Sequence, residues 1–322
     1  MPRLLADIGG THARFALAAA DGALTASMVL PCADHPTFES AIRHYLAAQE
    51  SPAVRDAAIA IANPVDGDAI RMTNHHWAFS IEATRRALGF DTLLLLNDFT
   101  ALALALPLLD ARELLPIGGG ARRPDMTIGL VGPGTGLGVS GLVRCGPRWQ
   151  ALASEGGHTS FAPVDDREAA ILTVVRRDFP HVSSERLISG PGLVLIHDAL
   201  RVLQGLPKQP ITPATIAAAA QSADCAICVE TAEAFSGMLG SFAGSLALTL
   251  GAFGGIYLGG GVIAGLGSAF DRDFFRSRFE AKGRFAGYLA RIATVQITAV
   301  NPALRGVAAA LADHLNDDRR RG

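Results

Sequence analysis

Lysine is almost absent from this chain of 322 residues, which contains only Lys208 and Lys282. The lysine-based phosphate loop has the pattern G-x-x-x-x-G-K-[ST], and neither lysine completes such a pattern. Their sequence contexts therefore exclude that loop. If the chain binds a phosphate, we expect backbone N–H groups and a metal ion to hold it.

A strong excess of either charge is also absent, because the net charge at pH 7 is −2. Such a balance offers no basic surface for DNA, RNA or an acidic membrane. Hydrophobic residues make up 49% of the chain and charged residues 18%, as in an ordinary compact protein. The length is sufficient for two domains with substantial cores.

Cysteine is scarce, with Cys32, Cys145, Cys225 and Cys228 as the four cases. No signal-peptide pattern marks the N-terminus, so we expect the reducing cytoplasm. Cys225 and Cys228 form a lone C-x-x-C motif without a second ligand pair. We therefore expect buried or half-buried thiols rather than a zinc or redox centre.

Charged residues are missing altogether between Ala234 and Phe270. A segment of this length could cross a bilayer. However, glycines interrupt it at 251, 254–255 and 259–261, and several hydroxyl residues lie within it. The pattern favours a buried helix followed by a buried strand.

Strand and helix patterns alternate along the rest of the chain, which indicates the α/β class with a largely parallel sheet covered on both faces. Ser80 is the expected N-cap of one helix, and Pro107 bends another. The expected helices are 37–49, 80–88, 99–109, 167–177, 192–203, 213–220, 226–250 and 302–315, and the expected strands are 56–62, 93–96, 255–258 and 295–300.

Two strand–turn–strand segments share one pattern. In the first, an apolar strand ends at Asp7 and Ile8, turns at Gly9-Gly10-Thr11 and resumes. In the second, the strand 127–131 runs into the glycine turn 132–138, which contains Gly134, Thr135 and Gly136, and resumes over 139–143. Glycine turns let backbone N–H groups approach an anion closely. The repeat predicts two related lobes that face one another.

The two lobes are expected to differ in size. We expect a small lobe of residues 1–110 with 300–322 and a large lobe of residues 111–299. The stretch from Pro116 to Pro124 is rich in glycine, proline and arginine, which is typical of a connector.

Asn97 and Asp98 lie where an apolar strand ends and a helix begins. Ligands of open α/β sheets gather at the carboxyl ends of strands, so Asp98 is well placed for chemistry. Capping the helix is an equally good use of the same carboxylate. Position alone does not separate the two interpretations.

Glu155 and His158 flank two glycines and could point at one small polyhydroxy ligand from a tight loop. A purely structural histidine is the alternative, and zinc is a weak case because no third ligand is near. Glu185 alone is an ordinary acid in the first turn of a helix. Gly259-Gly260-Gly261 could approach a nucleotide or form a simple tight turn. Together, these features favour a kinase of a neutral polyol.

Seven motifs follow one another along nearly the whole chain: Asp7–Thr11, Met72–Ser80, Leu96–Ala101, Gly132–Gly138, Glu155–His158, Glu185–Gly192 and Lys282–Phe285. With these motifs the chain resembles the bacterial glucokinases of the hexokinase/actin-like superfamily. Four positions depart from the family pattern: His12 replaces the usual Asn, Pro133 a common Ala, and Thr159-Ser160 the usual Val-Asp. No cysteine-rich zinc motif is present, which favours the branch outside the ROK family.

The resemblance implies a two-lobed α/β fold of the hexokinase/actin-like (ribonuclease H-like) type, with ATP in an interlobe cleft and a C-terminal helix that returns to the small lobe. It implies phosphorylation of D-glucose at the 6-hydroxyl, with Asp98 as general base. Thr11 and Thr135 would face the phosphates, and Asp7 would hold Mg²⁺ through water. The implied glucose contacts are Asn97, Asp98, Glu155, His158 and Glu185, and the implied ATP-binding residues are Asp7, Ile8, Gly9, Gly10, Thr11, Gly134, Thr135, Gly136, Gly259, Gly260 and Gly261.

The resemblance also implies a homodimer. A kinase of another hexose and a non-catalytic sugar-sensing protein remain alternatives. Regulators of this superfamily usually carry an N-terminal DNA-binding extension, whereas the first motif here begins at Asp7. An actin-like filament protein is disfavoured by the residues of the sugar loop.

Overall fold

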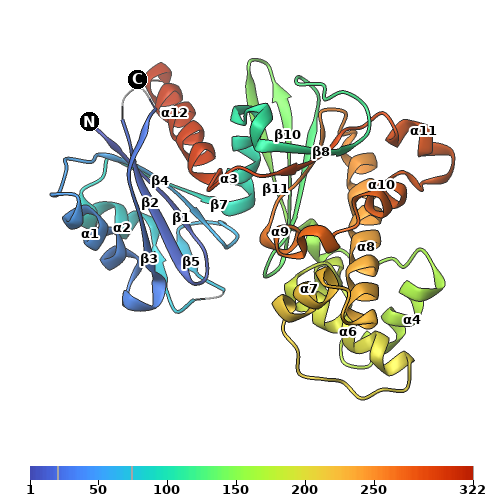
Figure 1. The fold of residues 1–322 in the computed structure, drawn as a ribbon. Helices are drawn as coiled ribbons and strands as arrows, with labels where there is room; N and C mark the ends of the chain where they lie inside the picture. The colour runs from blue at the N-terminus through green and yellow to red at the C-terminus, as the bar shows by residue number, and fades with distance from the viewer. Residues whose placement is uncertain (20–21, 74, 322) are drawn as a thin grey trace. The chain divides into compact units, whose positions relative to one another are not determined.

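The computed structural model describes residues 1–19, 22–73 and 75–321. Asn74, which belongs to the motif Met72–Ser80, lies outside the described residues. The structure is a mixed α/β fold with three sheets (Figure 1). The chain divides into two compact units, which are Met1–Asp110 with Ala299–Gly322 (unit 1) and Ala111–Thr298 (unit 2).

Unit 1 is built on a five-stranded sheet in the order β3-β2-β1-β4-β7. The first three strands are antiparallel to one another, and β1, β4 and β7 are parallel. A small sheet of β5 and β6 completes the unit. The strands are β1 (Arg3–Ile8), β2 (His12–Ala18), β3 (Leu24–Pro31), β4 (Asp56–Ile61), β5 (Ala69–Arg71), β6 (Ala78–Ser80) and β7 (Thr92–Asn97), and the helices are α1 (Phe38–Ala48), α2 (Ile81–Leu88), α3 (Asp98–Ala105) and α12 (Ala303–Arg321).

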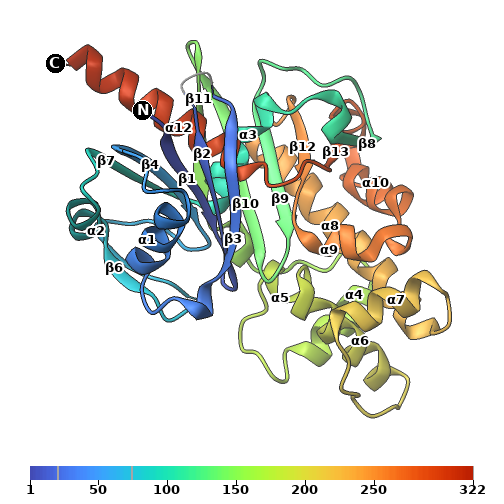
Figure 2. The same cartoon turned by 60° about the vertical axis from the view of Figure 1, so that its left-hand side comes forward.

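Successive side chains of β1 enter two different cores because they point to opposite faces of the sheet. Leu4 belongs to a core with α1, and Leu5 belongs to a core with α12. Figure 2 shows α1 and α2 on one side of the sheet and α12 with α3 on the other. The last helix of the chain therefore covers one face of the first sheet.

Unit 2 is built on a six-stranded sheet in the order β11-β10-β9-β12-β13-β8. The long helix α8 (Ala226–Leu250) is the centre of its core, and α4, α6, α7 and α10 contribute further apolar side chains. The strands are β8 (Leu114–Gly118), β9 (Ile128–Pro133), β10 (Leu137–Cys145), β11 (Arg148–Ser154), β12 (Gly255–Leu258) and β13 (Thr294–Ile297), and the remaining helices are α4 (Asp166–Val175), α5 (Ser184–Leu187), α6 (Gly190–Leu203), α7 (Pro213–Gln221), α9 (Gly261–Leu266), α10 (Arg272–Glu280) and α11 (Ala286–Leu289).

The two large sheets share one pattern. The order β11-β10-β9-β12-β13 repeats β3-β2-β1-β4-β7, with antiparallel pairing in the first part and parallel pairing in the second. The glycine turn between β9 and β10 therefore corresponds to the turn between β1 and β2. This repeat confirms that the two halves are related.

Two expectations about these sheets are wrong. Neither large sheet is largely parallel, because each begins with a three-stranded antiparallel segment. The stretch 116–124 is not simply a connector, since residues up to Gly118 belong to β8, which pairs with β13. Pro116 is tolerated there because β8 is an edge strand.

The uncharged stretch 234–270 consists of most of α8, the strand β12 and the short helix α9 with its flanking turns. None of the helices among the described residues combines the length and apolarity needed to cross a membrane. The prediction of a buried helix followed by a buried strand is confirmed, since all four residues of β12 are buried.

Candidate active site

In unit 1 the carboxyl ends of three parallel strands meet at one edge of the sheet. Ile8 of β1 pairs with Ile61 of β4, and Ile61 pairs with Asn97 of β7. The segment Asp7–Thr11 and the pair Asn97-Asp98 therefore share this edge. It is the edge at which open α/β sheets bind their ligands.

Asp7 is a half-buried carboxylate just before the first glycine turn. Its side chain is 19% exposed, and Nη1 of Arg14 on the neighbouring strand lies 3.9 Å from its Oδ2. Burial raises the pKa of Asp7, and the positive charge of Arg14 partly offsets this effect. The carboxylate is held near the turn without a close ion-pair partner.

The first turn is fixed by backbone hydrogen bonds. The N–H of Gly9 donates to the carbonyl of His12 at 3.0 Å, and Cys32 N donates to the carbonyl of Thr11 at 2.8 Å. His12 departs from the family pattern, and its Nδ1 lies 3.0 Å from the exposed hydroxyl of Thr11. The Thr11 hydroxyl thus has an imidazole partner in this chain.

The side chains of both Asn97 and Asp98 accept hydrogen bonds at the start of α3. Asn97 is the N-cap, and its Oδ1 accepts hydrogen bonds from Phe99 N at 2.9 Å and Thr100 N at 3.1 Å. Oδ1 of Asp98 also accepts from Phe99 N, at 2.9 Å. Both side chains therefore accept from the first turn of α3, so Asp98 is a capping residue as well as a strand-end carboxylate.

Asn63 is a polar residue at this edge that sequence reasoning did not select. Its carbonyl accepts a hydrogen bond from Nδ2 of Asn97 at 3.4 Å, and its side-chain Oδ1 accepts from the Thr73 backbone and hydroxyl at 3.0 and 2.7 Å. It comes directly after the predicted strand 56–62, and that position was the available signal.

In unit 2 the structure brings Glu155, His158 and Glu185 together. Nε2 of His158 lies 3.9 Å from Oε2 of Glu155, and Nδ1 lies 3.8 Å from Oε1 of Glu185. These separations exceed hydrogen-bond length. The side chains are 59% exposed for Glu155, 60% for His158 and 32% for Glu185, so the three polar groups remain accessible to a ligand.

Backbone pairing between two loops brings these residues into proximity. The N–H of Phe161 donates to the carbonyl of Val182 at 2.9 Å, and Ser184 N donates to the carbonyl of Thr159 at 2.8 Å. Ser160, another departure from the family pattern, places its hydroxyl 3.1 Å from Nε2 of His181. The loop that carries His158 is thereby aligned with the start of α5, which carries Glu185.

Glu185 is also bonded to the second glycine turn. Its Oε2 accepts a hydrogen bond from Leu137 N at 2.9 Å. A Cβ atom on Gly136 would lie 2.4 Å from that oxygen, and a Cβ on Gly157 would lie 2.1 Å from the carbonyl oxygen of Leu137. Glycine at both positions permits the contact between the turn and the acidic loop.

The third glycine segment packs on the second. Gly259 N donates to the carbonyl of Val131 at 2.9 Å, and Gly260, with φ of +83°, leaves no room for a Cβ beside the carbonyl of Pro133. Gly190 at the start of α6 donates to the carbonyl of Gly134 at 2.8 Å. Unit 2 therefore joins the Gly134–Gly136 turn, the Gly259–Gly261 turn and the N-terminus of the 14-residue helix α6. A helix N-terminus favours anions.

Among the described residues no group of three or more His, Cys, Asp or Glu side chains is arranged to hold a metal ion. The C-x-x-C motif lies at the start of α8, where Sγ of Cys225 accepts a hydrogen bond from Cys228 N at 3.3 Å. Both thiols are free, Cys228 is buried and Cys225 is half-buried, as expected.

A family model described as Glucokinase matches residues 4–314. The chain is 56% identical to the glucokinase of Chromobacterium violaceum, across 98% of this chain and 90% of that protein. It is 57% identical to the bifunctional protein glk of Burkholderia orbicola, across 98% of this chain, and it spans about half the length (49%) of that relative. The crystal structure of a glucokinase from an Antarctic psychrotroph superposes with a TM-score of 0.88 at 36% identity, covering 97% of this chain and 99% of that one.

Proposed function

The chain belongs to the glucokinase family, and we propose that it transfers the terminal phosphoryl group of ATP to the 6-hydroxyl group of D-glucose. The contact of Glu185 with both the imidazole of His158 and the Gly136 turn carries this proposal. It links a group suited to sugar hydroxyls with a turn suited to phosphate. Such a link fixes the acceptor hydroxyl relative to the donor phosphate.

Glucose is neutral, so the site selects it through hydrogen bonds rather than charge. The carboxylates of Glu155 and Glu185 accept from sugar hydroxyls, and His158 can donate or accept. Asn97 of unit 1 adds an amide group. A wrong sugar that covers these groups and leaves one of them unpaired binds less tightly, and sites built to hydrogen-bond a substrate hydroxyl discriminate by about four orders of magnitude.

Asp98 is the general base of the proposed reaction. The 6-hydroxyl is a poor nucleophile until its proton is accepted, and a positioned carboxylate typically contributes about 10²- to 10⁴-fold in rate. Its place directly after the last residue of β7, at the carboxyl ends of the parallel strands, supports this role. Positioning of the two substrates supplies most of the remaining acceleration.

The backbone turns Asp7–Thr11 and Gly134–Gly136 hold the phosphates of ATP, and Gly259–Gly261 lies under the nucleoside. When bound, Mg²⁺ would neutralise part of the negative charge of the phosphates. The single half-buried carboxylate of Asp7 fits that ion, because Mg²⁺ is usually held by one or two carboxylates together with water and substrate phosphates. Asp7 would orient the water through which the ion is held.

A test of this proposal measures ATP consumption with magnesium and a panel of hexoses, using the intact chain and Asp98→Asn. We expect turnover with glucose that falls by about 10²-fold or more in the variant, while calorimetry still detects glucose binding. Asp91→Asn is the matched control in unit 1, because Asp91 is an exposed carboxylate paired with Arg55.

Near-normal turnover in Asp98→Asn would rule out the base assignment. Turnover confined to another hexose would support the proposed mechanism but show that this hexose, rather than glucose, is the substrate. Binding of glucose without any turnover in the unmodified chain would contradict the kinase proposal and indicate a sugar sensor.

A further inference from the structure

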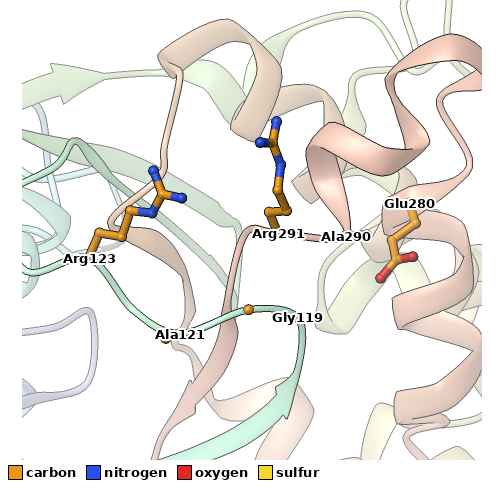
Figure 3. Close-up of a pocket in the computed structure, with 7 residues that line it drawn as sticks. Gly119, Ala121, Arg123, Glu280, Ala290 and Arg291 are labelled. Carbon is orange, nitrogen blue, oxygen red and sulfur yellow. The ribbon is translucent and has the colours of Figure 1, made fainter.

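A cavity of about 540 Å³ lies in unit 2, away from the glycine turns. Figure 3 shows it between the loop that follows β8 and the segment that precedes β13. This volume falls in the range of small-molecule sites. Its lining residues are Gly119, Gly120, Ala121, Arg123, Glu280, Ala290 and Arg291.

Two glycines fix the floor of this cavity. A Cβ on Gly119, which has a φ of +92°, would lie 2.1 Å from the carbonyl oxygen of Ile292. A Cβ on Gly120 would lie 2.5 Å from the carbonyl oxygen of Arg291. The loop therefore rests directly on the backbone of residues 291–292, and no larger residue could occupy these positions without displacing it.

The buried side chain of Arg276 holds the segment 289–292 through hydrogen bonds to its backbone. Its Nη1 donates to the carbonyl of Ile292 at 2.9 Å and its Nη2 to the carbonyl of Leu289 at 2.9 Å. Its Nε donates to Oε1 of Glu280 at 2.6 Å, so the charges of Arg276 and Glu280 compensate each other. Oε2 of Glu280 is left to accept a hydrogen bond from a ligand.

Arg123 and Arg291 give the cavity its positive charge. Both guanidinium groups lie against the ring of Phe253, at 4.9 Å and 5.7 Å from its centroid. Within the part of the chain that the structure describes, neither has a carboxylate within 4.0 Å. In Figure 3 the two side chains extend to the same side of the Gly119–Ala121 loop. The cavity thus presents two exposed, uncompensated positive charges.

This cavity is distinct from the glycine turns of the proposed active site because the two lie at opposite ends of the strands of the same sheet. Gly118 pairs with Thr294, the first residue of β13, whereas the turns Gly134–Gly136 and Gly259–Gly261 follow the last residues of β9 and β12. At about 3.3 Å per residue along β9, the two edges are on the order of 15 Å apart.

We propose that this cavity binds a phosphate monoester of a small polyhydroxy compound, such as a sugar phosphate. The two guanidinium groups match the charge of a phosphate monoester, which is close to −2 at neutral pH, and their planar donors suit phosphate oxygens. The carboxylate of Glu280 accepts from a hydroxyl group of the same ligand. The ligand does not reach the reacting groups, so the proposal holds whether or not the chain is a kinase.

Isothermal titration calorimetry of the intact chain, without nucleotide or magnesium, tests the proposal with glucose 6-phosphate, glycerol 3-phosphate and inorganic phosphate as probes. We expect the double substitution Arg123→Gln/Arg291→Gln to weaken binding of both esters by about tenfold or more, which corresponds to the loss of one charge-assisted hydrogen bond. Arg177→Gln/Arg284→Gln is the charge-matched control, because both of these arginines are exposed residues of unit 2 outside the cavity.

The substituted arginines are exposed, and unchanged thermal unfolding will show that the variants fold. Glu155→Ala removes binding at the proposed sugar site, and we expect it to leave glycerol 3-phosphate binding unaltered. Equal ester binding by the unmodified chain and the double variant would overturn the proposal. Inorganic phosphate that binds as tightly as the esters would also overturn it, since the cavity would then recognise an anion and no hydroxyl group.

Discussion

At the residue scale, the absence of a side chain at Gly136 keeps two parts of the proposed site in contact. These parts are the Glu185 carboxylate, proposed to bind the sugar, and the glycine turn, proposed to bind phosphate. Its missing side chain allows Glu185 to accept a hydrogen bond from Leu137 N. A Cβ at this position would lie only 2.4 Å from the Glu185 carboxylate. The Glu185 side chain would then turn away from His158.

We therefore expect Gly136→Ala to weaken glucose binding by about tenfold or more, the size of one charge-assisted hydrogen bond. Calorimetric titration with glucose provides the measurement. Gly134→Ala is the matched control within the same turn, because nothing lies within 4 Å of a Cβ at that position. Equal losses of glucose affinity in both variants would show that the turn, rather than Glu185, responds to the substitution.

The burial of the Asp7 carboxyl group has a measurable effect on the stability of the folded protein. Burial raises its pKa, with a smaller opposing effect from Arg14. A carboxyl group with a raised pKa in the folded state contributes stability below its unfolded pKa, and this contribution is lost as the pH rises through the folded pKa. The ionised carboxylate at neutral pH is therefore destabilising.

We expect Asp7→Asn to raise the melting temperature at pH 8 and to raise it less at pH 5, where the carboxyl group is closer to its raised pKa. Turnover with MgATP should fall by about 10- to 100-fold, as for other residues that position metal-bound groups. Thermal unfolding at the two pH values measures the first effect. Asp34→Asn, at an exposed position of unit 1, is the control, and a lower melting temperature for Asp7→Asn at pH 8 would contradict the argument.

The sequence selects candidate site residues by local pattern and leaves out their neighbours in space. Strand-end position singled out Asp98, and the two-glycine loop singled out Glu155 and His158, whereas Glu185 was selected through the resemblance. Asn63 was missed because a polar residue after a strand is ordinary in sequence. Its contact with the Asn97 amide appears only when β4 and β7 are paired.

At the scale of secondary-structure elements, the crossing of α12 and α3 depends on Gly306. A Cβ on Gly306 would lie 1.7 Å from the carbonyl oxygen of Ala101. The backbones of the two helices are therefore close enough to exclude even a methyl group. Glycine within a helix costs roughly 0.5–1 kcal/mol relative to alanine, so close packing must offset that cost here.

We expect Gly306→Ala to destabilise unit 1 by about 1–3 kcal/mol, as is typical of overpacked cores. The midpoint of urea unfolding measures the change. Gly287→Ala in α11 is the matched control, because it also adds a methyl group to a helix but meets nothing within 4 Å. It should be neutral or stabilising by up to about 1 kcal/mol, and a similar loss in both variants would refute the packing argument.

The elements that were predicted well and those that were missed differ in where they lie in the sheets. The helix 226–250 and the strand 255–258 were predicted with the observed boundaries because both are dominated by buried apolar residues. The strands β3, β8 and β11 were missed, and each is an edge strand, whereas the edge strand β7 was predicted from its run of four leucines. Edge strands have one unpaired side and more exposed side chains, so their hydrophobic pattern is weak.

At the scale of the whole molecule, the proposed glucose-binding residues come from both units. Asn97 and Asp98 belong to unit 1, whereas Glu155, His158 and Glu185 belong to unit 2. Bound glucose stabilises each unit whose residues hold it. At 100 times the dissociation constant, that stabilisation amounts to about 2.7 kcal/mol.

Hydrogen–deuterium exchange in the presence of glucose tests this proposal. We expect slower exchange, by up to about 100-fold, in the segments 97–100 and 156–159 together. Glu155→Ala should abolish protection in both segments at the same glucose concentration. Protection that remains confined to one unit would mean that the sugar site is built from that unit alone.

Unit 1 is assembled from both ends of the chain, and this has a consequence for its biosynthesis. One face of its sheet, which includes Leu5 and Ala58, is covered by Val307 and Leu311 of α12. Unit 2 lies between these segments in sequence. At about 5–20 residues per second, the ribosome needs on the order of 10–40 seconds to translate unit 2. During that time the part of this face that α12 covers lacks its native partner, and its apolar side chains can bind a chaperone until α12 emerges.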